Sequence, residues 1–412
     1  MPSAPPFDAV LFDLDGTLVA TDRFWVQAAR IGARRAFDEL ALERALPSTA
    51  EWMGLVGLPL EQGFDALFSD LDPSARRHLE AACVAEEHRL LEAGGAALMP
   101  GAAEALDALK ASGARLAVAS NCSQAYLDHM WEALGLARWM EAARCLASPG
   151  VLDKGDMLEQ LLGLFGTRSA VMVGDRATDG AAAAANGLPF VFCRFGFAPE
   201  GEWLAPGGSI DDFGALGTQL DARTEALDRM LDTIGARRAT FLPPAVLGVA
   251  GPPGSGATLL ARDLARRLDA AFLPLACYQA ATFDLAAFER EVLVPRARGE
   301  RVVVRRECAD AGGVPETVEV DVPPDRALVL ESPALFDPSL SSRLDRLLVV
   351  EVADDVALGR LAGRDARRYG PGSLEPARRR LAAWRELTAR VAPARVADLV
   401  VGLDNVLAPR LS

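Results

Sequence analysis

Two aspartates that lie two residues apart directly follow a short apolar run near the start of the chain. The run AVLF at residues 9–12 continues into Asp13-Leu14-Asp15-Gly16-Thr17. An apolar run that ends at acidic and glycine residues is typical of a buried parallel strand. In extended backbone, side chains two residues apart lie on the same side, so both carboxylates should emerge together. Asp and Gly are also common in solvated turns, but the buried strand before this pair favours a chemical role.

Three further polar groups follow later segments of the first half. Ser120 and Asn121 come after the run RLAVA, and Asp175 and Asp179 come after AVMV. Lys154 stands at the start of a helical pattern. Because parallel strands end at one edge of their sheet, we expect these side chains to converge there with the aspartates of the first strand.

Each of these residues also has an ordinary structural explanation. Ser120-Asn121 could cap the helix that begins near Gln124, because Ser and Asn are common N-caps. Asp179 could interact with a helix dipole, and Lys154 could be a surface residue. We favour a chemical role for Lys154 because the chain contains only two lysines, and arginine supplies its other basic positions. We favour an acid–base role for Asp15 over that of an ordinary turn residue, because no histidine is placed to transfer a proton.

The run FDLDGTL at residues 12–18 and the three later motifs, in this order, resemble the haloacid dehalogenase superfamily of phosphatases. The resemblance is to its phosphoglycolate-phosphatase-like branch with a helical cap, and it covers residues 7–220. It implies that Asp13 is a nucleophile that forms an aspartyl-phosphate, and that Asp15 is the general acid and then the base. It also places Ser120, Asn121 and Lys154 in the catalytic set.

The same resemblance implies a magnesium ion. Its ligands would be the Asp13 carboxylate, the Asp15 backbone carbonyl and Asp175, with Asp179 in support. Oxygen ligands of this kind suit Mg²⁺. The ion and Lys154 would neutralise charge on the transferring phosphoryl oxygens, which accounts for the larger part of such catalysis.

The order of elements in the first half predicts an α/β fold with a Rossmann-like parallel sheet. Apolar runs alternate with helical patterns, as in a doubly wound sheet. The runs are at residues 9–12, 115–119, 170–173 and 189–193, and the helices at 101–112, 124–134 and 154–164. Residues 20–98 read as an inserted all-helical cap, so that 7–19 and 99–220 form the core. A connecting helix at 221–238 and the Pro243-Pro244 linker would end this domain at residue 243.

The cap should determine the substrate. Residues 52–59, WMGLVGLP, could form a loop that closes over the active site or a simple turn between two helices, and both interpretations stay open. The cap arginines at positions 23, 34, 35, 76 and 77 are interpreted as solvated charges.

Alternation of strands and helices resumes after the linker and predicts a second α/β domain over residues 244–412. Strands are expected at 246–250, 301–305, 327–330, 346–352 and 398–401, and helices at 259–268, 354–368 and 375–392. Charge supports the boundary. Residues 244–412 carry 23 acidic and 23 basic residues, so the whole excess that gives the chain its net charge of −14 lies before them.

The second domain opens with a glycine-rich phosphate loop that lacks its lysine. The strand VLGVA leads into GPPGSGAT at residues 251–258, and Ala257 stands where the motif has lysine. Such a loop binds phosphate through backbone N–H groups and a helix N-terminus. The candidate nucleotide- or phosphate-binding residues are Gly251, Gly254, Ser255, Gly256 and Thr258.

Nearly all of residues 244–412 resemble the uridine kinase and phosphoribulokinase group, through Phe283-Asp284, Glu331, residues 363–370 and residues 397–400. The acidic pair of that group is replaced by Leu275-Ala276-Cys277-Tyr278. We therefore favour a degenerate, nucleotide-binding or pseudokinase module, with ATP or another nucleotide as its ligand, over an active kinase. Arginines at 360, 364, 367 and 368 could replace the lysine, but a solvated basic face is the favoured interpretation.

Composition excludes several other classes. The acidic net charge argues against nucleic-acid binding, and no apolar run is long enough to span a membrane or act as a signal segment. Six scattered cysteines without a CxxC pair indicate reduced thiols in a cytoplasmic protein.

The favoured function is the magnesium-dependent hydrolysis of a small phosphorylated metabolite, a phosphomonoester. Two alternatives are a bifunctional phosphatase and nucleoside or sugar kinase, and a nucleotide-binding regulator. Intact Asp13, Asp15, Lys154 and Asp175 argue against the regulator.

Overall fold

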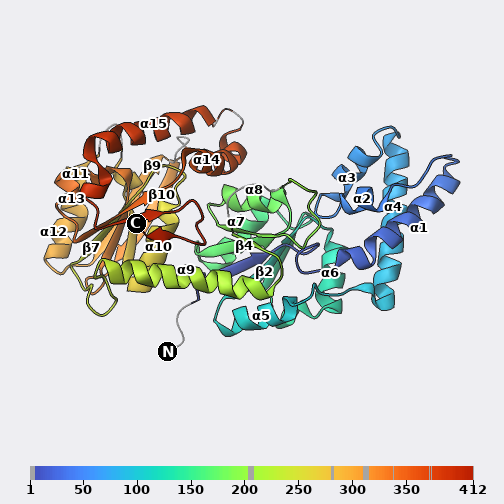
Figure 1. The fold of residues 1–412 in the computed structure, drawn as a ribbon, viewed down its shortest axis with the longest axis horizontal. Coiled ribbons are helices and arrows are strands. Elements are labelled where there is room, and N and C mark those ends of the chain that lie inside the picture. Colours follow the sequence, from blue (N-terminus) through green and yellow to red (C-terminus); the bar gives the residue numbers. More distant parts are fainter. Residues whose placement is uncertain are drawn as a thin grey trace. The chain divides into compact units, whose positions relative to one another are not determined.

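The computed structural model describes residues 5–202, 208–279, 283–309, 315–336, 338–370, 372 and 374–411 (Figure 1). Side chains at 308–309, 315–316, 366–369 and 394 are not described. The described residues form two compact units, one up to Thr218 and one from Gln219 onward. The boundary therefore falls inside helix α9 (Gly214–Thr233) rather than at the proline pair.

The first unit is built on a six-stranded parallel sheet in the order β3-β2-β1-β4-β5-β6. The strands are β1 (Ala9–Phe12), β2 (Arg115–Ser120), β3 (Ala142–Cys145), β4 (Ala170–Gly174), β5 (Phe190–Cys193) and β6 (Gly208–Ile210). The helices between them are α5 (Ala102–Ala111), α6 (Gln124–Ala133), α7 (Lys154–Phe165) and α8 (Ala177–Ala185). The predicted α/β fold with a parallel sheet is confirmed.

Burial explains why the central strands could be found from sequence. β1 and β4 are buried along their whole length, which is the pattern of parallel strands covered on both faces. On one face, Leu11 packs with Met157 and Leu158 of α7. Strands β3 and β6 escaped prediction because β3 is mostly half-buried and β6 has only three residues.

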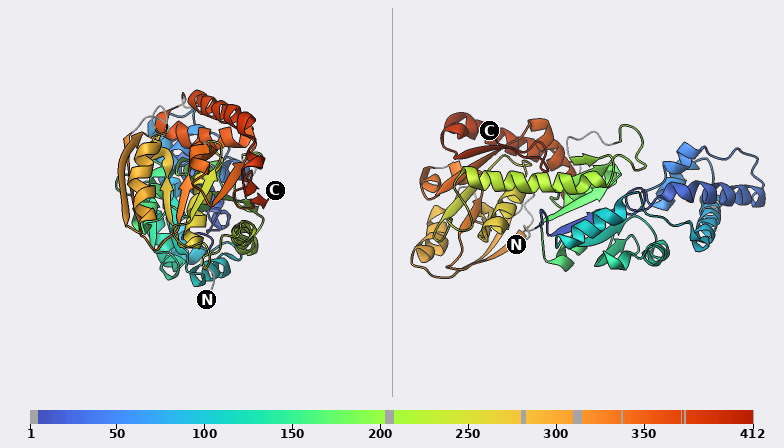
Figure 2. Two further views of the ribbon diagram at one scale, coloured as in Figure 1. Left: turned by 90° about the vertical axis from the view of Figure 1, so that its left-hand side faces the viewer. Right: turned by 60° about the horizontal axis from the view of Figure 1, so that its bottom comes forward.

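A group of helices is inserted between β1 and β2, as predicted for the cap. They are α1 (Trp25–Glu39), α2 (Thr49–Met53), α3 (Leu60–Leu67) and α4 (Pro73–Leu90). Figure 2 shows them gathered apart from the helices that cover the sheet. A cluster of Trp52, Phe64 and Phe68 forms their interior. Gly32 allows α1 to approach α4, because a Cβ there would lie 2.5 Å from the Cys83 Cα.

The second unit has a six-stranded sheet in the order β14-β13-β12-β7-β11-β8, parallel except for β14. Its strands are β7 (Val246–Ala250), β8 (Ala271–Pro274), β11 (Leu328–Glu331), β12 (Arg346–Glu351), β13 (Leu399–Gly402) and β14 (Arg410–Leu411). Its longer helices are α10 (Ala257–Leu268), α14 (Asp354–Tyr369) and α15 (Leu374–Val391), and its short ones are α11 (Leu285–Phe288), α12 (Val294–Ala297) and α13 (Pro338–Ser341).

Two expectations for this half need correction. The strand predicted at 301–305 is β9 (Val302–Ala309), which pairs with β10 (Pro315–Val322) in a separate two-stranded antiparallel ribbon. The predicted connecting helix is α9, and its apolar residues Leu227, Met230 and Leu231 belong to the core of the second unit. Because this packing is extensive, α9 is an integral helix of that unit and not a mere connection. Within the described residues, no helix is long and apolar enough to cross a membrane.

Candidate active site

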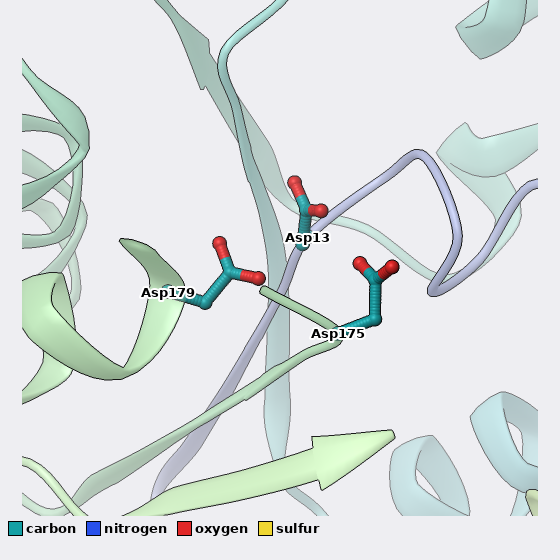
Figure 3. Close-up of side chains that lie close together, drawn as sticks. All are labelled: Asp13, Asp175 and Asp179. Atoms are coloured by element: carbon teal, nitrogen blue, oxygen red, sulfur yellow. The ribbon is translucent and has the colours of Figure 1, made fainter. Parts of the chain in front are cut away.

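Three buried aspartates meet at the carboxyl edge of the first sheet (Figure 3). Asp13 follows β1, Asp175 follows β4, and Asp179 lies in the first turn of α8. One carboxylate oxygen of each lies within 4.8 Å of those of the other two. The sheet register brings them together, because Phe12 pairs with Val173 and the Asp13 N–H donates to the Val173 carbonyl at 2.9 Å.

Lys154 completes this cluster. It begins α7, whose N-terminus is fixed by a capping box between Asp153 and Asp156. The Lys154 ammonium Nζ lies 2.7 Å from Asp13 Oδ1 and 2.5 Å from Asp179 Oδ1, with 4 % of its side chain exposed. The surface interpretation of Lys154 is therefore wrong. Burial alone would lower the pKa of Lys154, but the charges of Asp13 and Asp179 outweigh it and raise the pKa, so the side chain stays cationic.

The cluster holds more negative charge than one lysine can neutralise. Burial raises the pKa of Asp13 well above its ordinary value, although Lys154 opposes this. Burial and then the charge of Asp179 raise the pKa of Asp175 to about 7. Asp13 Oδ2 is buried and has no hydrogen-bond partner among the described residues. A set of carboxylate oxygens that includes one unpartnered buried atom fits a hard divalent cation.

Glycines let the aspartates approach each other. A Cβ on Gly174 would lie 2.3 Å from Asp179 Oδ2, and a Cβ on Gly16 would lie 2.3 Å from Asp175 Oδ2. Gly16 also has a φ of +79°, where residues with a side chain are strained. The Asp175 carboxylate is held by Thr17 Oγ1 at 3.3 Å and by the Phe197 N–H at 2.7 Å. These glycines therefore fix the spacing of the acidic groups.

The Asp15 carboxyl has different hydrogen-bond partners from Asp13. Its Oδ1 accepts hydrogen bonds from Tyr126 Oη at 2.5 Å and from Thr21 Oγ1 at 2.7 Å. Burial raises the pKa of Asp15, and the Tyr126 and Thr21 hydrogen bonds oppose that shift. The carboxyl also lines the cavity described below. Sequence reasoning missed Tyr126, because an aromatic residue on a helix reads as core.

Ser120 and Asn121 lie at the end of β2, beside β1. Ser120 is buried, and Asn121 Nδ2 donates to the Gly57 carbonyl of the cap at 3.0 Å. The helix that follows, α6, is capped by the Ser123 hydroxyl, which accepts from the Tyr126 N–H. Ser120 and Asn121 are therefore not its caps.

Arg176, which was not predicted, also connects the core to the cap. It is buried, it forms an ion pair with Glu202 at 2.9 Å, and its Nη1 donates to the Val56 carbonyl. The loop at 52–59 that it contacts joins α2 to α3, so it is a helix connection that also contacts the active site.

A cavity of about 550 Å³ lies between the cap and the core of the first unit. It is lined by Asp15, Ser120, Asn121 and Tyr126 from the core and by residues of α1, α3, α4 and the loop at 52–59 from the cap. A small ligand that enters it meets the Asp15 carboxyl.

In the second unit, the glycine-rich loop joins β7 to α10, as expected from its sequence. Gly254 and Gly256 have φ values of +78° and +87°, and a Cβ on Gly254 would lie 2.4 Å from the Ala357 carbonyl oxygen. Gly251 and the buried Ser255 belong to the same turn, and a Cβ on Gly251 would lie 2.7 Å from Ser255 Oγ.

The helix side of this loop carries one acidic contact. Thr258 Oγ1 donates to Glu331 Oε2 at 3.2 Å, and burial raises the pKa of Glu331 to about 7. Ala257, in place of the motif's lysine, is buried.

Arg360 contacts this loop instead of projecting into solvent. Its guanidinium donates to the Ser255 carbonyl at 3.1 Å and to the Asp404 carbonyl at 2.6 Å. The interpretation of a solvated basic face is therefore wrong for Arg360. Arg364 binds Asp365 at 2.6 Å. The side chains of Arg367 and Arg368 lie outside the described residues.

Comparison with known proteins supports the reading of the first unit. A model of the haloacid dehalogenase-like hydrolase family matches residues 7–187. A phosphoglycolate phosphatase of Rhodospirillum rubrum is 32 % identical over 244 residues, which cover 54 % of this chain and 94 % of that protein. One of Agrobacterium fabrum is 31 % identical over 252 residues, which cover 58 % of this chain and 100 % of that protein.

Among solved structures, a haloacid dehalogenase-like hydrolase of Streptococcus pneumoniae aligns with a TM-score of 0.45 and 21 % identity, over 51 % of this chain and 97 % of its own. The family assignment depends on the sequence matches, in which almost the whole of each relative is covered. The chain belongs to the haloacid dehalogenase-like hydrolase family, and its first unit is a phosphatase of that family.

Proposed function

We propose that the first unit hydrolyses a small phosphomonoester with Mg²⁺, through a phosphoenzyme formed on Asp13. The observation that carries this proposal is the meeting of Asp13, Asp175, Asp179 and Lys154 at one buried point. Such a cluster costs folding free energy unless it serves a cation and an anion, because buried like charges repel.

The protein's own groups would supply both chemical steps. In the first, a carboxylate oxygen of Asp13 forms a bond to phosphorus while the bond from phosphorus to the ester oxygen breaks, and Asp15 gives its proton to the leaving oxygen. In the second, Asp15 takes a proton from water, whose oxygen attacks phosphorus and releases phosphate and the Asp13 carboxylate. The position of Asp15 supports this acid–base role, because its carboxyl lines the cavity while Asp13 is paired with Lys154.

Mg²⁺ would be held by the Asp13 carboxylate, the Asp15 backbone carbonyl and Asp175. When bound, it would neutralise charge on the phosphoryl oxygens. Asp179 binds Lys154 and accepts from the Arg176 N–H at 3.0 Å, so it would act by positioning the ammonium. Lys154 would then bind a phosphoryl oxygen, with Ser120 and Asn121 as further hydrogen-bond donors.

Phosphate release is the direct test. The full chain should release phosphate from p-nitrophenyl phosphate with Mg²⁺, lose this activity in EDTA, and recover it when Mg²⁺ is restored. Asp13→Asn should lower kcat at least about 10³-fold, because the nucleophile is lost. Asp38→Asn, an exposed residue of α1, is the matched control and should retain wild-type kcat. Wild-type turnover by Asp13→Asn would refute the proposal.

We also propose that the second unit binds a nucleotide through residues 251–258 without efficient phosphoryl transfer. The positive φ of Gly254 and Gly256 and the helix that starts at Ala257 suit a phosphate. The missing lysine argues against the kinase alternative, because that cation normally contacts the transferred phosphate. Calorimetry of the full chain with ATP and Mg²⁺ should give heat of binding that Gly254→Val abolishes. Binding that survives this substitution would place the nucleotide elsewhere.

A further inference from the structure

The cavity beside Asp15 is where the leaving group of the substrate would lie, if the function proposed above is right. Asp15 lines the cavity, whereas Asp13 and Lys154 do not. The phosphoryl group would therefore face the buried cluster, and the alcohol part of the ester would extend toward the cap. The chemistry of the cavity wall should match that alcohol.

The acidic and basic residue types in the described wall of the cavity are all acidic. Four carboxyl residues line the cavity, namely Asp15, Glu61, Glu80 and Glu87. Within the described ranges of the chain, no lysine, arginine or histidine lines the cavity. Much of the remaining wall is apolar and includes Trp25, Leu55 and Leu58. A wall of this kind repels an anionic leaving group.

Two of these four carboxyl groups lie on one face of helix α4. Glu80, Val84 and Glu87 follow the spacing i, i+4 and i+7, which places them on one face of the helix, toward the cavity. Glu87 has 8 % of its surface exposed. Within the described part of the chain, its carboxyl makes no hydrogen bond or ion pair, and burial raises the pKa of Glu87 to about 8.

The neighbouring glutamate shows the contrast. Glu86 is equally buried, but it is paired with Arg35 at 3.0 Å and with Arg89 at 2.8 Å. The fold therefore supplies two arginines for Glu86, whereas Glu87, which lines the cavity, has no basic partner among the described residues. Glu80 has its pKa raised by burial and then by the charge of Glu61, so these two carboxyls are also close enough to repel each other.

We infer that the leaving group carries a protonated amine, which makes the substrate an aminoalkyl phosphomonoester. An ammonium in the cavity would donate hydrogen bonds to the carboxyl groups of α3 and α4. The carbon chain that carries it would contact the apolar wall. A leaving group with a carboxylate, such as that of phosphoglycolate, would lie beside four carboxyl residues and meet no basic side chain among the described lining residues.

Three esters of similar size separate the charge of the leaving group from its shape. They are 2-aminoethyl phosphate, 2-hydroxyethyl phosphate and 2-phosphoglycolate, used with the full chain and Mg²⁺. We expect kcat/KM to fall in that order, with at least about tenfold between the first and the last, which corresponds to one favourable charge interaction. A kcat/KM for 2-phosphoglycolate equal to or above that for 2-aminoethyl phosphate would overturn the inference, as would equal values for all three.

Substitution then assigns the preference to α4. Glu87→Gln and Glu80→Gln should each lower the ratio of kcat/KM for the amino ester to that for the hydroxyl ester by about tenfold. Glu92→Gln removes an exposed carboxyl outside the cavity and should leave this ratio unchanged. An unaltered ratio in both cavity variants would contradict the assignment.

Two further measurements keep the inference testable. If Glu87→Gln does not fold, inhibition of the wild-type chain by free ethanolamine and by glycolate gives the same comparison, and stronger inhibition by glycolate counts against an amine. Turnover of p-nitrophenyl phosphate reports the phosphatase proposal separately. Turnover of that ester with a preference for 2-phosphoglycolate would remove only the inference about the leaving group, whereas no turnover of any ester would remove the phosphatase proposal itself.

Discussion

At the scale of single residues, Asp13 and Asp15 are neighbours in sequence but occupy different electrostatic environments. Asp13 Oδ1 binds Lys154, whereas Asp15 Oδ1 accepts from two hydroxyl groups. A nucleophile must be ionised and a proton donor must be protonated, so two carboxyls with different neighbours can divide these tasks. The sequence showed the pair but not its partner Tyr126.

Tyr126→Phe should move the pH profile of phosphate release. The Tyr126 hydroxyl lowers the pKa of Asp15, so its removal leaves the burial that raises this pKa less opposed. As a general acid, Asp15 is active below its pKa, and activity is lost as pH rises through that value. The alkaline limb of log kcat/KM should therefore shift to higher pH. A limb that moves downward, or stays in place with lower kcat, would assign Tyr126 a structural role only.

At the scale of elements, the site depends on how closely α8 approaches the end of β4. Gly174 ends β4, and the position of its missing side chain is taken by the Asp179 carboxylate. The other oxygen of that carboxylate, Oδ1, binds Lys154 of helix α7. A small displacement of either helix would separate the ammonium from Asp13.

Gly174→Ala should lower both activity and stability. The added Cβ would lie 2.3 Å from Asp179 Oδ2 and force Asp179 away from Lys154. We expect kcat to fall at least about 10²-fold and the free energy of unfolding to fall by about 2 kcal/mol, as for an overpacked core.

Gly163→Ala is the matched control for this change. Gly163 is an exposed residue within α7, and a Cβ there would meet no atom within 4 Å. It should raise the free energy of unfolding by about 0.5–1 kcal/mol and leave kcat unchanged. Thermal unfolding and initial rates measure both variants. Wild-type kcat in Gly174→Ala would show that the close approach is not required.

At the scale of the whole molecule, α9 belongs to both units, and most of it packs in the second. Arg223 of this helix forms a buried ion pair with Asp263 of α10 and also donates to the Val406 carbonyl. The proline pair that suggested a boundary lies after this helix. A fragment that ends at residue 243 would therefore expose the apolar face of α9, including Leu227 and Met230.

Arg223→Ala should destabilise the second unit selectively. It removes the buried Arg223–Asp263 ion pair, and loss of one member of a buried pair costs about 3–5 kcal/mol. Thermal unfolding should show a transition of the second unit at lower temperature, while phosphate release at 25 °C keeps its wild-type kcat. Equal loss of phosphate release would show that the two units are functionally coupled through α9.

The sequence by itself determined the elements and motifs whose signals are local. The buried runs of β1, β4 and β7, the helical insertion, and the residues Asp13, Lys154 and Asp175 could be named because strand burial and motif spacing depend on near neighbours. Only the tertiary structure shows that Tyr126 binds Asp15 and that Arg176 binds the cap loop. Only the tertiary structure shows that Glu87 lines a cavity, whereas Glu86 is paired with two arginines. Apart from the local pair of Glu86 and Arg89, those contacts join segments far apart in the chain. The balance of burial and charge at each contact depends on tertiary packing, which local sequence patterns do not specify.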